Sequence, residues 1–267
     1  MLERLHQPPE ESARPDSEPL PPCWSLALVR LLCPEMSGLG TDSGVLRRMQ
    51  RWRISWKMGR LHLVSPDPDY TRKLEAIAAA RARAADDPAR VRVLYADEVT
   101  FYRRPERGRN WHRRGGGGRA QPTTKQAPGS NTKRRVIGAL DTVDGRVCSM
   151  SRSVIGVRAL IAFLHQLRKH YGPDMELVVV WDNWPPHHHP EVLAAAAMLK
   201  IVLLNTPTYA PWTNPIEKLW DKLKDEVPRL HRLSDKWVEL RKRVDRFLEG
   251  LLRPNPGLLR HVGLLPN

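Results

Sequence analysis

Short apolar runs alternate with longer amphipathic segments from about residue 69 onward. The apolar runs are rich in β-branched residues and predict strands at about 91–103, 109–114, 134–141, 175–181 and 201–206. An Asp-Gly pair within 141–146 favours a hairpin after the third strand. The amphipathic segments predict helices at about 69–86, 156–171, 190–200, 214–227 and 234–252. Antiparallel strands followed by β-α-β units predict an α/β fold, with a mixed sheet and helices on both faces.

The chain before this region has a different character. Its first residues are Pro-rich and lack periodicity, which predicts a flexible leader. A capped helix is expected within 41–58, with Arg47, Arg48 and Arg51 projecting away from its apolar side. These side chains fit a DNA-recognition helix, and equally an ordinary Arg-rich surface helix. The expected parts are a leader at 1–24, a partial helix-turn-helix region at 25–66, a connecting helix at 67–90 and a sheet domain at 91–267.

The composition points to a globular protein with a polyanionic partner. Of the 267 residues, 41% are hydrophobic, and 44 Lys and Arg against 29 Asp and Glu leave a formal charge of +15. An excess this large favours nucleic acid, through neutralisation of phosphates and release of counterions. Three widely spaced Cys residues indicate neither a disulfide framework nor a zinc ribbon, and no apolar stretch reaches the length of a membrane span. We therefore expect a soluble, unexported cytoplasmic protein without a membrane partner.

A basic segment lies between the first and third expected strands. Residues 103–135 hold eleven Arg and Lys, one Glu and a run of glycines. A flexible loop of this kind suits contact with a phosphate backbone, and Arg113, Arg114 and Arg119 are candidates for that contact. The alternative is a solvated surface loop.

Three acidic residues occupy settings that suit catalysis. Asp97 interrupts the apolar run VRVLYADEVTFYR, where an unpaired acid costs several kcal/mol. Asp182 ends the run LVVVW, at the place where ligands gather on open α/β sheets, although an Asx-type turn would also explain it. Glu98 has to face away from Asp97, because side chains alternate along a strand. Converging carboxylates on a basic chain suggest Mg²⁺ acting on a nucleic-acid backbone.

Glu217 and His187 each allow two interpretations. Glu217 lies near the start of an expected helix, where Asn214 as N-cap and Glu217 as third residue form a capping-box pattern that is compatible with a catalytic role. His187 begins a run of three His residues whose adjacency disfavours one shared metal ion. We assign it to phosphate contact or to support of the acidic site, with a surface turn as the alternative.

The three acidic blocks YADEVTFY, WDNWPPHH and PTYAPWTNPIEKLWDKLK resemble those of the DDE transposases of bacterial insertion sequences, in the mariner-type superfamily. The resemblance covers about 90–230, with a weaker extension back to about 41, and the 34 residues between Asp182 and Glu217 match the family's interval. It implies a ribonuclease H-like fold in which Asp97, Asp182 and Glu217 are catalytic. They would hold two Mg²⁺ ions roughly 3.5–4 Å apart, with Mn²⁺ as a substitute.

The same resemblance implies an activity and its partners. The expected reaction is metal-dependent cleavage of double-stranded DNA at element ends, followed by transfer of the 3′ hydroxyl into target DNA by a homodimer on the DNA. Family members usually carry two DNA-binding subdomains upstream, and that space is shortened here. A catalytically inactive remnant that regulates by binding DNA is therefore an alternative, and a ribonuclease H-like nuclease without strand joining is another.

Overall fold

The computed structural model describes residues 5, 9, 21, 23–36, 38–56, 64–108 and 122–266. The chain forms two compact units, Met1–His62 and Leu63–Asn267, which are described separately. Most of the leader expected at 1–24 and the whole strand expected at 109–114 lie outside the described residues.

Within residues 23–56, the described part of the first unit contains the α-helices α2 (Leu26–Leu32) and α3 (Asp42–Arg51), with the 3₁₀ turn η2 (Pro34–Met36) between them. Thr41 caps α3 by accepting a hydrogen bond from the Gly44 N–H at 3.1 Å, as the sequence predicts. The helix ends well before residue 58. Its contact with α2 is made by a small buried cluster: Val29, Cys33, Met36 and Val45.

The second unit is built on a five-stranded mixed sheet. Its strands are β1 (Val91–Tyr102), β2 (Lys133–Asp141), β3 (Val147–Arg152), β4 (Glu176–Trp181) and β5 (Ile201–Asn205). Their order is β3-β2-β1-β4-β5. β1 pairs antiparallel with β2, which pairs antiparallel with β3, whereas β4 is parallel to both β1 and β5. The predicted α/β fold with a mixed sheet is confirmed.

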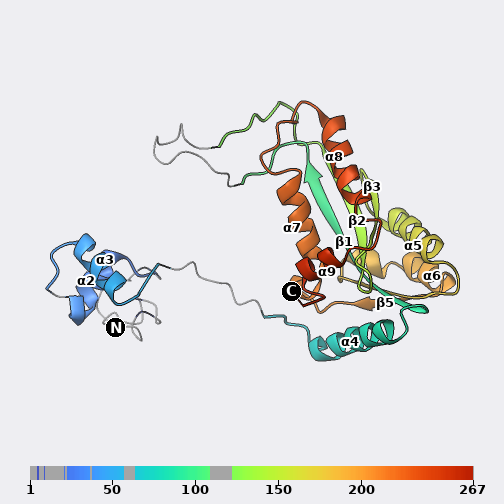
Figure 1. The fold of residues 1–267 in the computed structure, drawn as a ribbon, viewed down its shortest axis with the longest axis horizontal. Coiled ribbons are helices and arrows are strands. Elements are labelled where there is room, and N and C mark those ends of the chain that lie inside the picture. The colour runs from blue at the N-terminus through green and yellow to red at the C-terminus, as the bar shows by residue number, and fades with distance from the viewer. Residues whose placement is uncertain are drawn as a thin grey trace. The chain divides into compact units, whose positions relative to one another are not determined.

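Helices cover both faces of this sheet (Figure 1). They are α4 (Tyr70–Asp86), α5 (Val157–Tyr171), α6 (Pro190–Met198), α7 (Ile216–Glu226), α8 (Trp237–Glu249) and α9 (Pro256–Val262). One core holds side chains of α4, α7, α8 and α9 against one face, and a second core holds those of α5 and α6 against the other. The short helix α9 was not expected, because seven residues carry too little periodicity to stand out.

The expected hairpin joins β2 to β3. Asp141 accepts the Val143 N–H at 2.8 Å, and Gly145 adopts a positive φ of 76° that glycine tolerates best. A Cβ atom at Gly145 would lie 2.3 Å from the carbonyl oxygen of Asn255, so the turn also needs glycine for close packing. Over the described ranges, no helix combines the length and the apolar character that crossing a membrane requires.

Candidate active site

Three carboxylates line one cleft at the end of the sheet. Asp97 lies within β1, Asp182 follows β4 directly, and Glu217 lies in the first turn of α7. Tyr95 pairs with Val180 across the parallel strands, so Asp97 and Asp182 each follow that pair by two residues and reach the same level of the sheet. The cleft has a volume of about 320 Å³ and is lined by all three carboxylates.

Asp97 is held from the side of α7. The indole N–H of Trp220 donates a hydrogen bond to Asp97 Oδ2 at 3.0 Å. Gly138 faces Asp97 in the β1–β2 register, and a Cβ atom there would lie only 2.6 Å from Trp220 Cη2. Glycine at this position therefore makes room for the buried indole that holds the carboxylate. The bond joins residues 123 positions apart, and no local sequence pattern indicates it.

Negative charge accumulates around Asp97. Burial, followed by the charge of Glu217 and smaller effects of Glu98 and Asp182, raises the pKa of Asp97 to about 8. Burial also raises the pKa of Glu217, and the charges of Asp221 and Asp182 act in the same direction while Lys224 opposes them. The ionised forms of both carboxyl groups are therefore disfavoured relative to free carboxylates, and a bound cation would oppose this shift.

Asp182 has the opposite electrostatic setting. Partial burial disfavours its charge, but hydrogen bonds from the His187 side chain and the Trp184 N–H outweigh this and lower the pKa of Asp182. His187 Nδ1 lies 3.0 Å from Asp182 Oδ1, and His187 Nε2 lies 3.2 Å from Glu98 Oε1. Burial opposes charge on the imidazole, yet its bonds to these two carboxylates raise the pKa of His187 to about 9. A protonated His187 thus bridges Asp182 and Glu98.

This geometry does not fit the expectation that His187 contacts a DNA phosphate. Its side chain is only 2% exposed, and both ring nitrogens face carboxylate oxygens. The imidazole also stacks on Trp181, with ring centroids 4.3 Å apart. Of the interpretations left open by the sequence, support of the acidic site is the one that agrees with these contacts. Glu98 faces away from Asp97, as alternation along β1 requires, and meets His187 there.

The capping box predicted at the start of α7 is wrong. Pro215 occupies the N-cap position, and no side chain caps the helix. Asn214 instead turns towards β1, where its Nδ2 donates to the Ala96 carbonyl at 3.3 Å. Its Oδ1 atom is buried in the cleft wall and has no hydrogen-bond partner within the described part of the chain. Tertiary contact with β1 has replaced local capping.

The cleft does not contain a preformed metal cage. Across the described ranges, no three His, Cys, Asp or Glu side chains are grouped closely enough to hold an ion by themselves. The side-chain groups available in the cleft are carboxylate and amide oxygens, which suit hard cations such as Mg²⁺.

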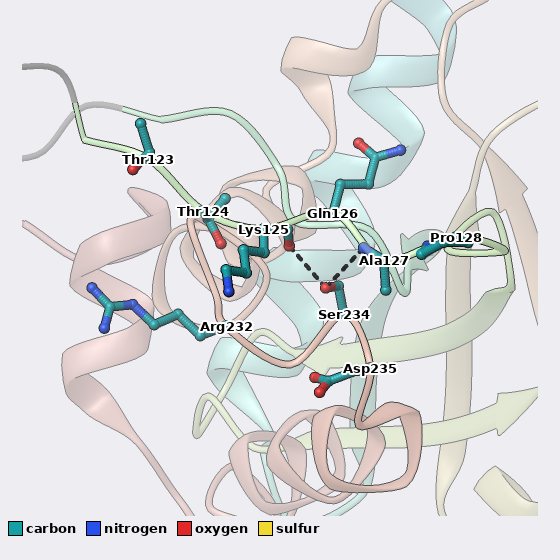
Figure 2. Close-up of a pocket in the computed structure, with 9 residues that line it drawn as sticks. All are labelled: Thr123, Thr124, Lys125, Gln126, Ala127, Pro128, Arg232, Ser234 and Asp235. Carbon is teal, nitrogen blue, oxygen red and sulfur yellow. Dashed lines mark hydrogen bonds between the residues drawn. The ribbon is translucent and has the colours of Figure 1, made fainter. Parts of the chain in front are cut away.

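A larger hollow lies elsewhere, between residues 123–128 and 232–235 (Figure 2). It measures about 880 Å³, and Ser234 fixes its wall by donating to the Lys125 carbonyl at 2.8 Å and accepting from the Ala127 N–H at 3.1 Å. Asp235 is the sole carboxylate among its lining residues in the described ranges. The smaller acidic cleft is therefore the better candidate for catalysis.

Three of the other residues expected to contact DNA lie on α3, and the remaining three lie outside the described residues. Arg47 and Arg51 are exposed on α3. Arg48 donates to the Glu35 carbonyl at 3.2 Å, and its guanidinium lies 6.0 Å from the ring centre of Trp52, so it also ties the unit together. The remaining three candidates lie outside the described residues: Arg113, Arg114 and Arg119.

A mixed sheet of this order, with an acidic cleft beside Asp97 of β1 and the end of β4, is that of a ribonuclease H-like fold. Residues 92–241 match the family model described as the DDE superfamily endonuclease. The chain belongs to the DDE superfamily of endonucleases, as the three acidic blocks imply.

Known relatives agree with this assignment. The chain is 30% identical over 237 residues to a Shigella sonnei protein described as the insertion element IS630 uncharacterized 39 kDa protein. That match covers 88% of this chain and 66% of the relative, so the chain spans somewhat less than two thirds of the relative's length.

Solved structures support the fold. The Mos1 transposase paired-end complex with left transposon end matches with a TM-score of 0.64 at 15% identity, covering 95% of this chain and 79% of that one. The Mos1 mariner paired-end complex with Mn matches with the same TM-score and identity, covering 96% and 80%. At this level of identity, the likeness concerns the fold.

Proposed function

We propose that the chain acts as a transposase, which cuts DNA at the ends of an element and joins the freed 3′ hydroxyl to target DNA. Asp97, Asp182 and Glu217 are the proposed catalytic and metal-binding residues. The observation that carries the proposal is their meeting in one cleft from three separate segments, where burial and nearby negative charge raise the pKa of both Asp97 and Glu217.

The residues of the cleft fit divalent cations. Mg²⁺ is usually held by one or two carboxylates together with substrate phosphates, so the lack of a closed three-ligand group among the described residues agrees with sites that DNA completes. Asn214 Oδ1, which has no partner among the residues that the structure describes, adds a buried oxygen acceptor to the wall of the cleft. When bound, two Mg²⁺ or Mn²⁺ ions would activate the attacking oxygen and stabilise the leaving oxygen of an in-line displacement at phosphorus.

The chain's own groups prepare this chemistry in two ways. Trp220 holds Asp97 in place through its indole N–H, while a protonated His187 keeps Asp182 ionised and oriented. Water, or later the 3′ hydroxyl of the cut strand, attacks the phosphorus, and the bond to the leaving oxygen breaks as the new bond forms. No covalent intermediate with the protein is needed.

Double-stranded DNA is the proposed partner of the basic surface. Arg47 and Arg51 on α3, together with the basic segment at 103–135, would hold phosphates and so supply affinity without reading sequence. Transposition has to bring two element ends together, so we propose that two copies of the chain act on the DNA.

Cleavage and strand joining are measured with purified protein and labelled DNA carrying the inverted repeat that flanks the gene. We expect nicking and joined products with Mg²⁺ or Mn²⁺, and neither with EDTA. Asp182→Asn should lower the nicking rate by at least about 100-fold, because it removes a proposed metal ligand, whereas DNA binding should persist or tighten.

Asp235→Asn is the matched control, since it neutralises a carboxylate in the other hollow and should leave nicking unchanged. Wild-type nicking by Asp182→Asn would remove Asp182 from the site. Nicking without joined products would favour the nuclease alternative, and DNA binding without metal-dependent nicking would favour the inactive remnant.

A further inference from the structure

We propose that Tyr209 is a stacking platform for an unpaired nucleobase of the DNA strand whose phosphate lies in the acidic cleft. This inference rests on the proposed function of that cleft and names a further contact that the substrate would make there. Tyr209 lines the cleft together with Asp97, Asp182 and Glu217.

The side chain of Tyr209 is exposed to solvent, and the backbone of this residue adopts an unfavourable conformation. The residue is 79% exposed, although it belongs to the wall of the cleft. Its φ of 53° lies in the left-handed region, which a bulky residue rarely occupies and which costs of order 1–3 kcal/mol. Strain of this kind persists where the surroundings fix it, and it gathers at sites that bind or react.

Several contacts fix the loop that carries Tyr209. Thr208, the residue before it, donates its N–H to Asp67 Oδ2 at 2.7 Å, and its carbonyl accepts from Ser65 Oγ at 2.6 Å. Asn183 Nδ2 donates to the Thr206 carbonyl at 2.8 Å. The loop is thus bound both to the segment that precedes α4 and to the residue that follows Asp182.

Asp67 is the centre of these contacts. Its side chain is 3% exposed, and a salt bridge of 2.7 Å joins it to Lys73 in α4. The hydrogen bond from Lys73, followed by that from the Thr208 N–H, keeps the pKa of Asp67 well below its usual range. A carboxylate that stays ionised holds the backbone of the loop in one conformation, which lowers the ordering cost of binding at Tyr209.

The neighbouring aromatic residues are already engaged within the protein. Trp184 packs edge-on against His187 with ring centroids 5.4 Å apart, and Trp212 Nε1 lies 3.4 Å from the hydroxyl of Tyr70. Tyr209 has neither a hydrogen bond nor a ring contact with any residue that the structure describes. Tyr209 is also the most exposed of the three, at 79% against 48% for Trp212, while Trp184 is half-buried, so its ring offers the most open face to a ligand.

A nucleobase is the ligand that the setting favours. The cleft suits a phosphate held through cations, and every phosphate of a DNA strand has bases attached to the adjoining sugars. Every base offers a π-face, so stacking on an exposed tyrosine would fix the strand without demanding a particular sequence. An opened base pair beside the cutting site would supply such a base.

The test uses a DNA duplex with a single-stranded 3′ extension that carries one 2-aminopurine, moved through successive positions. Ca²⁺ replaces Mg²⁺, and the salt is high enough to suppress binding by charge alone. We expect wild-type protein to quench the fluorescence at one position. Tyr209→Asn removes the ring and suits a positive φ, and it should abolish that quenching and weaken binding by about 5- to 150-fold.

Two matched comparisons isolate the ring. Tyr209→Phe should behave as wild type, and Met198→Ala, at an exposed position at the end of α6, should also leave quenching unchanged. When an abasic site replaces the quenched base, DNA binding by the wild-type protein should weaken by the same factor as the Tyr209→Asn substitution causes. The affinity of Tyr209→Asn itself should not change with that replacement.

The proposal would be overturned if Tyr209→Asn quenched 2-aminopurine as fully as wild type does, or if Tyr209→Phe lost as much quenching as Tyr209→Asn. Equal weakening of Tyr209→Asn on base-containing and abasic DNA would also overturn it, because the ring would then be supporting protein structure. Cleavage is not measured in this assay, so failure of the proposed catalytic function would appear separately, in the Asp182→Asn nicking experiment.

Discussion

Asp97 and Asp182 stand at the same level of neighbouring strands, yet the protein treats their charges in opposite ways. Burial and the charges of neighbouring carboxylates raise the pKa of Asp97 to about 8, although the Trp220 indole N–H donates a hydrogen bond to it. The side chain of Asp182 is 52% exposed and is bonded to a protonated His187, and its pKa is lowered. The two faces of the sheet produce this difference, because α7 supports Asp97 while Glu98 and His187 act from the other side.

The contrast indicates a division of labour between the carboxylates. Asp182 is ready as an anion at neutral pH, so it would meet an arriving cation without losing a proton. Asp97 gains its full charge when a cation offsets its burial and the charge of Glu217, so ion binding would release a proton from this side. In the free protein the carboxylates of this site repel one another, and the proposed metal ions would reduce that repulsion.

The largest expected effect comes from neutralising Asp97. The raised pKa favours the protonated carboxyl in the folded state. The contribution of Asp97 to the free energy of unfolding is therefore fully present below about pH 4 and is lost as the pH rises through about 8. Asp97→Asn cannot ionise, so without metal it should be the more stable protein above pH 8, by at most roughly 5 kcal/mol. The gap should vanish near pH 4, as measured by denaturant unfolding.

The corresponding change at Asp182 should have the opposite sign. Its lowered pKa stabilises the folded chain above about pH 4, and this contribution is lost as the pH falls further. Asp182→Asn should therefore be less stable than wild type at pH 8, where Asp97→Asn is more stable. Destabilisation of both variants at pH 8 would refute the electrostatic contrast.

The next effect concerns the room that Gly138 leaves for Trp220. In Gly138→Ala the new methyl group would lie 2.6 Å from Trp220 Cη2, so the indole has to shift away from Asp97. We expect a loss of about 1–3 kcal/mol in the free energy of unfolding. Gly156→Ala is the control, since no atom lies within 4 Å of its added Cβ. Equal effects of the two substitutions would mean that close packing at Gly138 is unimportant.

Much of this fold follows from local sequence pattern. The strands have clear apolar runs, α5 and α7 have strong periodicity, and the Asp-Gly turn marks the hairpin between β2 and β3. The three acidic blocks likewise pointed to a shared site, and the structure brings Asp97, Asp182 and Glu217 to one cleft. Their catalytic roles stay predictions until the variants are measured.

The contacts that tune the site could not be predicted in the same way. Asn214 fits a local capping pattern, but its bond to Ala96 depends on how α7 packs across β1. The contact between Glu98 and His187 joins residues 89 positions apart, which one sequence does not reveal. Gly138 within a strand was the one available signal, because a glycine there often marks the close approach of another group.

The smallest expected effect tests the bridge on the other face of the sheet. Glu98→Gln keeps the size of the side chain but removes the charge that faces His187 Nε2 at 3.2 Å. Protonated His187 stabilises the fold, and this contribution is fully present below about pH 6.5 and is lost as the pH rises through about 9. The variant should therefore be less stable than wild type at pH 6, by about 1 kcal/mol in the free energy of unfolding. The difference should close above pH 9, where the imidazole is neutral in both proteins.

Glu191→Gln, at an exposed position on α6, is the matched control and should stay within about 0.5 kcal/mol of wild type at either pH. A gap for Glu98→Gln that is the same at pH 6 and above pH 9 would mean that Glu98 contributes by packing alone, and that Asp182 keeps its charge without this bridge.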